Sequence, residues 1–394
     1  MASLVLRGGL VWDGLGDASL EANVVVDGGM VAGLGPDAGG AESLDISGCT
    51  VLPGLIEGHA HLCFNAQADW RQVYDADSPA RMALRMAANG RAMLEAGITT
   101  VRDLGAPTGI SIEVREAFAA GLALGPHLLV SGAPITTTGG HCYFMGGEAD
   151  GPVGLQRAVR EHVKAGVDWI KVMATGGNMT RGTNTFAAQY SVEELQVLVA
   201  DAHRLRRKVA AHAHGVEGIR VAVAAGVDMV EHCTFSVPGG IDLDEGLIAE
   251  IEATGIVVSP TTSVGYRRWP DDGQRTRRKQ VMQAIFAHGC KVLMSTDCGI
   301  PGVPHAALAG GMQVLSELSG RAPAQVLKLA TSGAAELLDL PDRGIIAAGK
   351  VADLLVVEGD PAVDLSCLNR VRFVLKAGEI VVARPAPDVV AAMP

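Results

Sequence analysis

Short apolar runs alternate with amphipathic helical patterns through the middle of the chain. The helical patterns include residues 80–97 and 191–207, whose apolar positions recur at the spacing of one helix face. Apolar runs of strand length flank such patterns at 55–61, 98–105, 126–132, 168–175, 208–214, 228–234, 255–261 and 291–297. Eight strands that alternate with helices predict an α/β fold, a (β/α)8 TIM barrel over residues 54–343.

The two ends of the chain carry a different pattern. Residues 1–53 and 344–394 contain short apolar runs separated by Gly and Asp, which is typical of antiparallel strands joined by tight turns. We therefore expect both ends to pair with each other in a small β-sandwich domain beside the barrel.

Length and composition agree with a barrel plus a smaller domain. The chain has 394 residues, of which 48% are hydrophobic and 19% charged, so a large core is available and long disordered segments are not expected. The formal net charge is −11, and the short basic runs at 204–208 and 275–279 fit solvated helix faces. Nucleic acid is therefore not an expected partner.

Apolar stretches and cysteines bear on the location of the protein. No uninterrupted apolar stretch is long enough to cross a membrane, and the first residues lack the apolar centre of a signal peptide. The seven Cys include no CxxC pair, which is typical of reduced thiols. We expect a cytoplasmic protein with no membrane partner.

Polar side chains interrupt or end several of the predicted barrel strands. Active sites of such barrels form where the carboxyl ends of the strands meet, so we expect these side chains to gather there. Imidazole and carboxylate groups are ligands for zinc and similar divalent ions, and the set as a whole predicts a metal site. Its members are His59, His61, Lys171, His212, His232 and Asp297.

Positions within single strands support this prediction. Side chains two positions apart on a strand point to the same face, so His59 and His61 can address one ion. Lys171 stands between apolar neighbours in the fourth strand, where an unpaired ammonium group is costly. This lysine is therefore expected to be paired or chemically modified.

Five motifs follow one another along these strands, and together they resemble the amidohydrolase superfamily. They are PGLIEGHAH at 53–61, WIKVMAT at 169–175, VAAHAHG at 209–215, VEHCT at 230–234 and MSTD at 294–297. The chain is most similar to the imidazolonepropionase-like and Xaa-Pro dipeptidase-like branch. The resemblance extends to residues 137–151 and 344–361 and so covers essentially the whole chain.

The resemblance implies a centre of two divalent metal ions in the barrel domain. His59, His61 and Asp297 match the ligands of the buried ion, and His212 and His232 match those of the second ion. Lys171 matches a carboxylated lysine that bridges both ions. Zinc is the expected metal, and Mn²⁺, Co²⁺ and Fe²⁺ also suit these ligands.

The resemblance also implies a metal-dependent hydrolase that cuts an amide bond in a small molecule. Peptide-like substrates, N-acyl amino acids and aryl or alkyl amides are the expected classes. A metal-bridging hydroxide would attack the carbonyl, and Asp297 would act as general base and then as general acid. An alternative is a mononuclear deaminase or cyclic-amide hydrolase like imidazolonepropionase, against which Lys171 argues. A non-catalytic protein on this fold is disfavoured because no ligand is missing.

Loops after the strands are expected to contact the substrate. His141 and Tyr143 follow the third strand, and Arg181, which follows the fourth, could pair with a substrate carboxylate. His214 is expected to act in catalysis by polarising the scissile carbonyl. Residues 266–278 can form a polar or aromatic rim. A homo-oligomer is compatible with this architecture.

Overall fold

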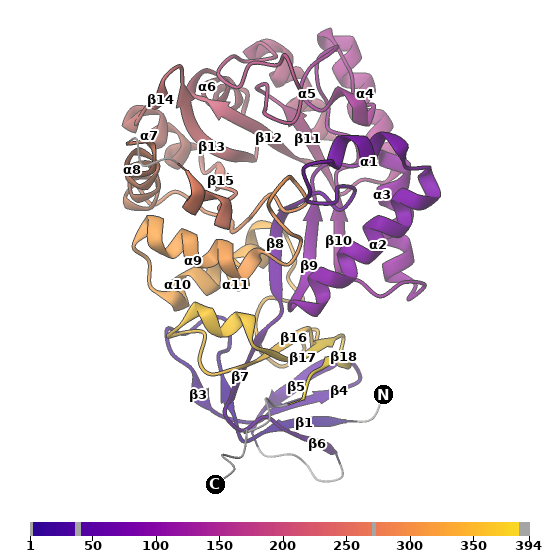
Figure 1. Cartoon of the computed structure of the whole chain (residues 1–394), viewed down its shortest axis with the longest axis vertical. Helices are drawn as coiled ribbons and strands as arrows, with labels where there is room; N and C mark the ends of the chain where they lie inside the picture. Colours follow the sequence, from indigo (N-terminus) through magenta and orange to yellow (C-terminus); the bar gives the residue numbers. More distant parts are fainter. Residues whose placement is uncertain (1–2, 36–40, 270–272, 386–394) are drawn as a thin grey trace. The chain divides into compact units, whose positions relative to one another are not determined.

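The computed structural model describes residues 3–35, 41–269 and 273–385 of the chain. Their contacts divide the chain into two compact units, which Figure 1 traces in sequence colours. The β-rich unit comprises Met1–Ile56, Met93–Thr99 and Ala322–Pro394, and the larger unit comprises Glu57–Ala92 and Thr100–Arg321.

The observed division differs from the expected one in three segments. Residues 54–56, 93–99 and 322–343 fall into the β-rich unit, whereas the sequence pattern placed them with the barrel. The assignment rests on contacts between residues that are distant in sequence. A helical pattern alone could not predict it, because such a pattern does not show against which core a helix packs. Parts of the expected β-sandwich, namely residues 1–2, 36–40 and 386–394, lie outside the described residues.

The β-rich unit is built from two sheets of short strands. Its strands are β1 (Leu4–Arg7), β2 (Leu10–Val11), β3 (Leu20–Glu21), β4 (Val24–Asp27), β5 (Met30–Leu34), β6 (Glu42–Asp45), β7 (Cys49–Pro53), β16 (Leu354–Glu358), β17 (Val371–Lys376) and β18 (Glu379–Ala383). One sheet has the order β5-β4-β1-β6, and the other has the order β18-β17-β16-β7-β2-β3. Strands from both ends of the chain thus share a sheet, in which β16 runs antiparallel to β7 with Val356 opposite Val51.

Alternating side chains form the core of this unit. Val24 and Val26 in β4 are buried, and Val25 between them is only partly buried, because side chains two apart on a strand share a face. They belong to the same apolar cluster as Leu354 and Val356 of β16. Residues 344–353 form no strand before β16, apart from one bridge at Val351, although their apolar pattern predicted one.

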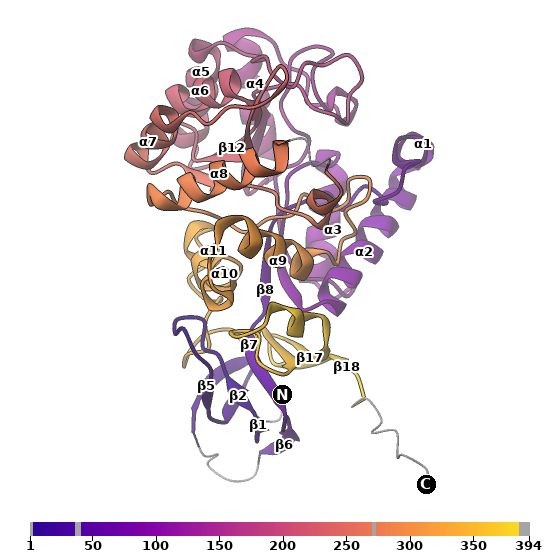
Figure 2. The ribbon, with the colours of Figure 1, turned by 60° about the vertical axis from the view of Figure 1, so that its left-hand side comes forward.

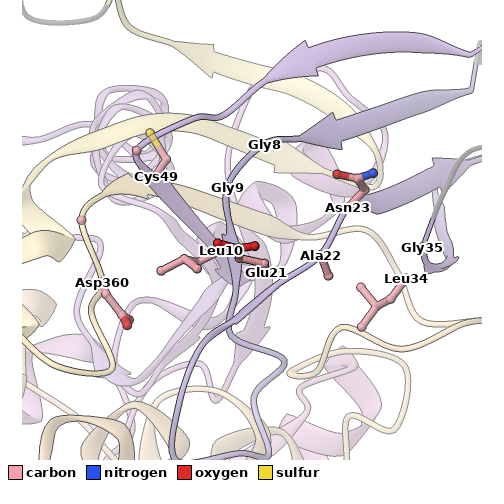
Figure 3. Close-up of a pocket in the computed structure, with 12 residues that line it drawn as sticks. Gly8, Gly9, Leu10, Glu21, Ala22, Asn23, Leu34, Gly35, Cys49 and Asp360 are labelled. Carbon is pink, nitrogen blue, oxygen red and sulfur yellow. The ribbon is translucent and has the colours of Figure 1, made fainter.

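A surface hollow of about 990 Å³ lies in the β-rich unit and is lined largely by turn glycines (Figure 3). Leu10 and Leu34 add apolar surface, and Glu21 and Asp360 carry its carboxylates. Asp360 already accepts a hydrogen bond from the Ser19 hydroxyl. No histidine or lysine is among the described residues that line the hollow, so it does not contain the predicted metal site.

Parallel strands form the central part of the larger unit. They are β8 (Leu55–Ala60), β9 (Ile98–Asp103), β10 (His127–Val130), β11 (Trp169–Met173), β12 (Lys208–Gly215), β13 (Met229–Val237) and β15 (Val257–Ser259), with the short antiparallel β14 (Gly240–Ile241). One sheet has the order β10-β9-β8, and the other has the order β11-β12-β13-β14, with β15 also paired to β13. In the second sheet Lys171 lies opposite Ala210, and His212 lies opposite Glu231.

The expected eighth strand, residues 291–297, is not a regular strand in the structure. Its backbone forms a single parallel bridge, between Val292 and Val258 of β15. The N–H of Thr296 donates instead to the Glu57 carboxylate at 2.9 Å. A backbone donor that binds a side chain is lost to a strand ladder, which explains why regular pairing stops here.

Helices flank these strands. In the larger unit they are α1 (Trp70–Ala76), α2 (Pro79–Glu95), α3 (Thr108–Ala119), α4 (Gly151–Ala165), α5 (Val192–Arg204), α6 (Val216–Ala225), α7 (Glu245–Thr254), α8 (Gln274–Ala287) and α9 (Leu308–Ser319), and in the β-rich unit α10 (Pro323–Leu329) and α11 (Ser332–Leu337). Consecutive helices from α3 to α9 pack against one another, as Figure 2 shows for α5, α6 and α7. Ser191 and Glu194 form a capping box that begins α5. None of the described helices is long and apolar enough to cross a membrane.

Candidate metal centre

The carboxyl ends of the parallel strands deliver the predicted side chains to one cavity of the larger unit. Strands that run parallel bring their ends to the same edge, so residues far apart in sequence become neighbours. The cavity has a volume of about 320 Å³. It is lined by every residue of the predicted metal site, namely His59, His61, Lys171, His212, His232 and Asp297, and also by the predicted catalytic residue His214.

His59, His61 and Asp297 form the first of two groups that could hold a metal ion. The Nε2 atoms of the two histidines lie 3.3 Å apart, and Asp297 Oδ1 lies 3.4 Å from the first and 3.2 Å from the second. Glu231 binds His59 Nδ1 at 2.8 Å, and the Gly105 carbonyl binds His61 Nδ1 at 3.1 Å. When both Nδ1 atoms donate, two nitrogen lone pairs and a carboxylate oxygen meet, and a cation relieves their repulsion.

His212, His214 and His232 form the second group, with one nitrogen of each ring within 4.8 Å of the others. An oxygen engages one nitrogen of each ring and leaves the other nitrogen available to an ion. These contacts join His212 Nε2 to the Gly176 carbonyl at 3.1 Å, His214 Nδ1 to the Thr234 hydroxyl at 3.1 Å and His232 Nδ1 to the Thr261 hydroxyl at 2.9 Å.

Burial keeps four of these five imidazoles neutral; burial also disfavours the charged form of His61, but Asp297 outweighs burial there and raises the pKa of His61. The pKa of His59 is lowered to about 4, first by burial and then by the charge of Lys171. Burial also lowers the pKa of His214 to about 4 and holds the pKa values of His212 and His232 well below the ordinary value. A neutral imidazole presents the lone pair that metal coordination requires. At neutral pH His59, His212, His214 and His232 therefore present nitrogen lone pairs rather than imidazolium charges.

Lys171 places an amine in the same cavity. Its side chain is buried, and Nζ has no hydrogen-bond partner among the described residues. Burial lowers the pKa of Lys171 to about 8, although the carboxylates of Glu231 and Asp297 oppose this shift. The neutral amine is therefore populated near neutral pH, and it is available for covalent modification.

A buried ion pair that the sequence motifs did not single out orients His59. Arg102 Nη2 donates to Glu231 Oε1 at 2.8 Å, and Glu231 Oε2 contacts His59 Nδ1 at 2.8 Å. Burial raises the pKa of Glu231, but Arg102 and His59 outweigh it and lower that pKa to about 2. A carboxylate behind a histidine fixes the tautomer and orientation of the ring. The sequence feature that could have identified Arg102 and Glu231 is a charged residue inside an apolar strand, which is the same feature that identified Lys171.

We expect Glu231→Gln to lower the free energy of unfolding of the metal-free protein by about 3–5 kcal/mol, because Arg102 then loses its carboxylate inside the core. Urea unfolding measures the change. The control Glu217→Gln, at an exposed position of α6, should stay within about 0.5 kcal/mol. Adding Arg102→Met should recover most of the loss. A single-variant loss below about 1 kcal/mol would show that the guanidinium has other adequate partners.

The backbone at the centre is strained at two of the predicted ligands. His232 has a φ of 67° and Asp297 a φ of 59°, in the left-handed region that side chains other than glycine avoid. Each such residue costs about 1–3 kcal/mol, so its surroundings must hold it. Arg278 does so for the middle of β13, because it donates to the carbonyls of His232 and Cys233 at 3.1 and 2.8 Å.

The structure brings only some of the predicted substrate residues to the cavity. His141 is buried and lines it, with its ring centroid 4.6 Å from that of His212. Tyr143 is 39% exposed and is not part of the described lining. Arg181 is exposed and is also absent from that lining. A substrate carboxylate inside the cavity therefore needs a partner other than Arg181.

A second cavity, of about 270 Å³, adjoins the first and shares His214, His232 and Asp297 with it. Tyr266 and Trp269, from the expected rim segment, line this second cavity, with ring centroids 5.4 Å apart. Residues 270–272 of the expected rim lie outside the described residues.

Comparison with known proteins identifies the family. Residues 50–382 match the amidohydrolase family, and the chain belongs to that family. Ochratoxinase from Aspergillus niger is 28% identical over 95% of this chain and 86% of its own length. Imidazolonepropionase from Cutibacterium acnes is 26% identical over 85% of this chain and 83% of its own. A solved Xaa-Pro dipeptidase with methionine in its active site is 28% identical, with a TM-score of 0.86 over 96% of this chain and 99% of its own.

These matches confirm the resemblance that the five motifs indicated. The protein is a hydrolase that acts on carbon–nitrogen bonds. Its mixed α/β fold matches solved amidohydrolases, which are of the TIM-barrel type. Members of this family generally bind metal ions, and the two histidine groups described above are the candidates in this chain.

Proposed function

We propose that this protein hydrolyses an amide bond at a centre of two zinc ions. The observation that carries the proposal is the buried Lys171 Nζ, which has no partner among the described residues and lies in a cavity lined by histidine rings. A mononuclear centre would leave this amine without a role. The names of the similar ochratoxinase and Xaa-Pro dipeptidase support an amide substrate.

The residues present fit two divalent ions. His59, His61 and Asp297 would hold the first ion, and His212 and His232 the second. Lys171 would bridge them as a carbamate, which forms when the neutral amine nitrogen bonds to the carbon of carbon dioxide and releases one proton. The carbamate is an anion with two oxygens, and its formation withdraws the lysine from the ammonium form, which is costly to bury.

The chain's own groups would move the protons. Two divalent ions, when bound, would lower the pKa of a shared water and polarise the scissile carbonyl. Asp297 would accept a proton from the attacking water and donate it to the leaving nitrogen. Burial raises the pKa of Asp297, but His59, His61 and Lys171 outweigh burial and lower it, so the carboxylate is ionised at neutral pH.

His214 would hold the carbonyl oxygen of the substrate. It lines both cavities, and the Thr234 hydroxyl lies 3.1 Å from its Nδ1. Because the Thr234 hydroxyl donates to the main-chain carbonyl of His214 at 3.0 Å, it accepts from Nδ1, and the ring proton would have to lie on Nε2 before His214 could donate to a developing oxyanion. His141, buried beside His212, would contact the substrate from the other side of the lining.

We also infer that the parallel strands close into a (β/α)8 barrel with residues 291–297 in the eighth position. Single parallel bridges support this closure at the places where the two sheets do not pair as regular strands. They join Ile135 to Val172, Val258 to Val292 and Ala60 to Cys298.

Metal stoichiometry tests the proposed function. Protein produced with zinc and bicarbonate should contain about two metal ions per chain by elemental mass spectrometry. Chelation should abolish hydrolysis of amide substrates, and zinc with bicarbonate should restore it better than zinc alone. About one ion per chain, with ammonia released from heterocycles, would contradict the bridging lysine and favour a mononuclear deaminase or cyclic-amide hydrolase.

A further inference from the structure

The buried carboxyl group of Glu57 joins the two segments that carry the first group of metal ligands. Glu57 lies in β8, two positions before His59, and its side chain is fully buried. Its Oε1 accepts from the main-chain N–H groups of His59 at 3.0 Å and of Thr296 at 2.9 Å. Its Oε2 accepts from the Thr296 hydroxyl at 2.6 Å. One side chain therefore binds the main chain of one ligand and the residue that precedes Asp297.

The contacts of Thr296 replace a hydrogen bond that a regular sheet would contain. The Gly58 N–H donates to the Met294 carbonyl at 3.2 Å, and in a regular parallel pair the Gly58 carbonyl would accept from the Thr296 N–H in return. That carbonyl instead accepts from Arg102 Nε at 2.8 Å. Glu57 therefore provides the acceptor that the buried Thr296 N–H requires.

This departure from the sheet determines where the Asp297 carboxylate lies. Asp297 has a φ of 59°, which a residue of an extended strand does not adopt. Its Oδ1 lies 3.4 Å from His59 Nε2 and 3.2 Å from His61 Nε2. Main-chain contact with the β8 segment resumes directly afterwards, because the His61 N–H donates to the Cys298 carbonyl at 2.8 Å. The left-handed turn is thus confined to the predicted ligand between two anchored neighbours.

We propose that Glu57 positions Asp297 for the first metal ion. Its carboxyl group holds the Thr296 main chain out of the sheet, so that the Asp297 carboxylate meets the two imidazoles of its group. The inference rests on the proposed metal centre. A carboxyl group that is one methylene shorter is expected not to reach Thr296 and the His59 N–H together, whereas the carboxamide of glutamine has the reach of glutamate.

Zinc affinity tests this role. Glu57→Asp should raise the dissociation constant of zinc at the first group about 10–100-fold, the usual cost of losing a residue that orients a metal ligand. Glu57→Gln should change it less than about threefold, because the amide oxygen can accept both N–H groups and the amide nitrogen can donate to the Thr296 hydroxyl. Competition with a zinc chelator in a His212→Ala background measures the first group, because this background lacks a ligand of the second ion.

A double-mutant cycle with Asp297→Asn shows whether Glu57 acts through Asp297. When Asp297→Asn is already present, adding Glu57→Asp should change zinc affinity less than about threefold, because the positioned carboxylate is then absent. In the protein with both ions, Glu57→Asp should lower kcat for amide hydrolysis about 10–100-fold. KM should stay within about twofold, because Glu57 does not line the cavity that would hold the substrate.

Two further variants complete the design. Glu161→Asp, at an exposed position of α4, is the matched control and should leave zinc affinity and kinetics unchanged. Thr296→Val removes the hydroxyl that binds Oε2 and keeps the N–H group, so it should weaken zinc binding less than Glu57→Asp does. Urea unfolding shows whether each metal-free variant is folded. If Glu57→Asp does not fold, Thr296→Val decides the matter, and unchanged zinc affinity in it overturns the proposal.

Unchanged zinc affinity in a folded Glu57→Asp protein would overturn the proposal. An equal loss in Glu57→Asp and Glu57→Gln would show that the charge of Glu57 matters rather than its reach, and it would overturn the proposal as well. Additive losses with Asp297→Asn would show that Glu57 supports the cavity in general, with the same consequence.

The zinc measurements need no substrate, so they separate this inference from the proposed function. Weaker zinc binding in Glu57→Asp, in a protein that cleaves no amide, would support the positioning role and contradict amide hydrolysis. Full zinc affinity in Glu57→Asp together with intact amide hydrolysis would overturn the positioning role and leave the proposed function standing.

Discussion

Lys171→Met is expected to lower kcat/KM for amide hydrolysis by more than about 10²-fold, because the loss of a residue that merely supports a metal ligand already costs about 10–100-fold. In the proposed centre, carboxylated Lys171 supplies two oxygens that hold both ions, and methionine supplies none. The variant should also contain fewer metal ions per chain than the unsubstituted protein. Steady-state kinetics and elemental mass spectrometry measure the two effects on the same preparation.

The fold should tolerate this substitution. Methionine replaces a buried amine that has no hydrogen-bond partner among the described residues with an apolar side chain of similar length. The free energy of unfolding of the metal-free protein should therefore stay equal or rise, by up to about 4 kcal/mol. Lys164→Met, at an exposed position of α4, is the control and should change neither activity nor metal content.

A second variant separates loss of the bridge from general damage to the cavity. Lys171→Ala leaves space that a short carboxylic acid such as propionate can enter, and its carboxylate can replace the carbamate oxygens. Partial recovery of activity with added propionate is expected in Lys171→Ala and not in Lys171→Met. Full activity with unchanged metal content in both variants would contradict the bridging role.

Asp297→Asn is expected to lower kcat by about 10²–10⁴-fold, the usual contribution of a general base and acid. The amide has the same shape as the carboxylate, but it cannot accept the proton of the attacking water at neutral pH. It also removes the charge that lies 3.2 Å from His61 Nε2 and 3.4 Å from His59 Nε2. Kinetics over a pH series measure the effect, and the acid limb that Asp297 sets in the unsubstituted protein should disappear.

Metal content decides how the loss is interpreted. An Asp297→Asn preparation that keeps both ions and still loses kcat supports proton transfer by Asp297, whereas one that loses an ion supports a ligand role. Asp242→Asn, at an exposed position before α7, should leave kcat within about twofold. Full activity of Asp297→Asn would contradict both roles.

The site could be predicted from the sequence to the extent that parallel strands bring their ends together. His59, Lys171, His212 and His232 each lie in a strand whose apolar pattern shows its limits, His61 directly follows such a strand, and the structure places all five in one cavity. Their roles as ligands remain predictions. The contacts of loop residues could not be predicted in this way, because no periodicity shows the direction in which an irregular segment runs. The sequence therefore did not show that Arg181 lies outside the cavity lining.

Long-range polar contacts could not be predicted from local pattern. Arg278 belongs to a short basic run that fits a solvated helix face, yet it is buried against carbonyls in the middle of β13. Arg102 and Glu231 are separated by more than a hundred residues, and only the packing of β9 near β13 joins them. The irregular course of 291–297 likewise depends on the distant Glu57 carboxylate.

The sequence by itself determined the alternation of strands and helices, the family, and the residues with metal-binding chemistry, because periodicity, turn residues and motifs are local properties. The tertiary structure decided which nitrogen of each histidine is available, that Lys171 Nζ has no partner among the described residues, and that a buried arginine lines the second cavity. Those properties depend on burial and on contacts between distant segments, which exist only once the chain has folded.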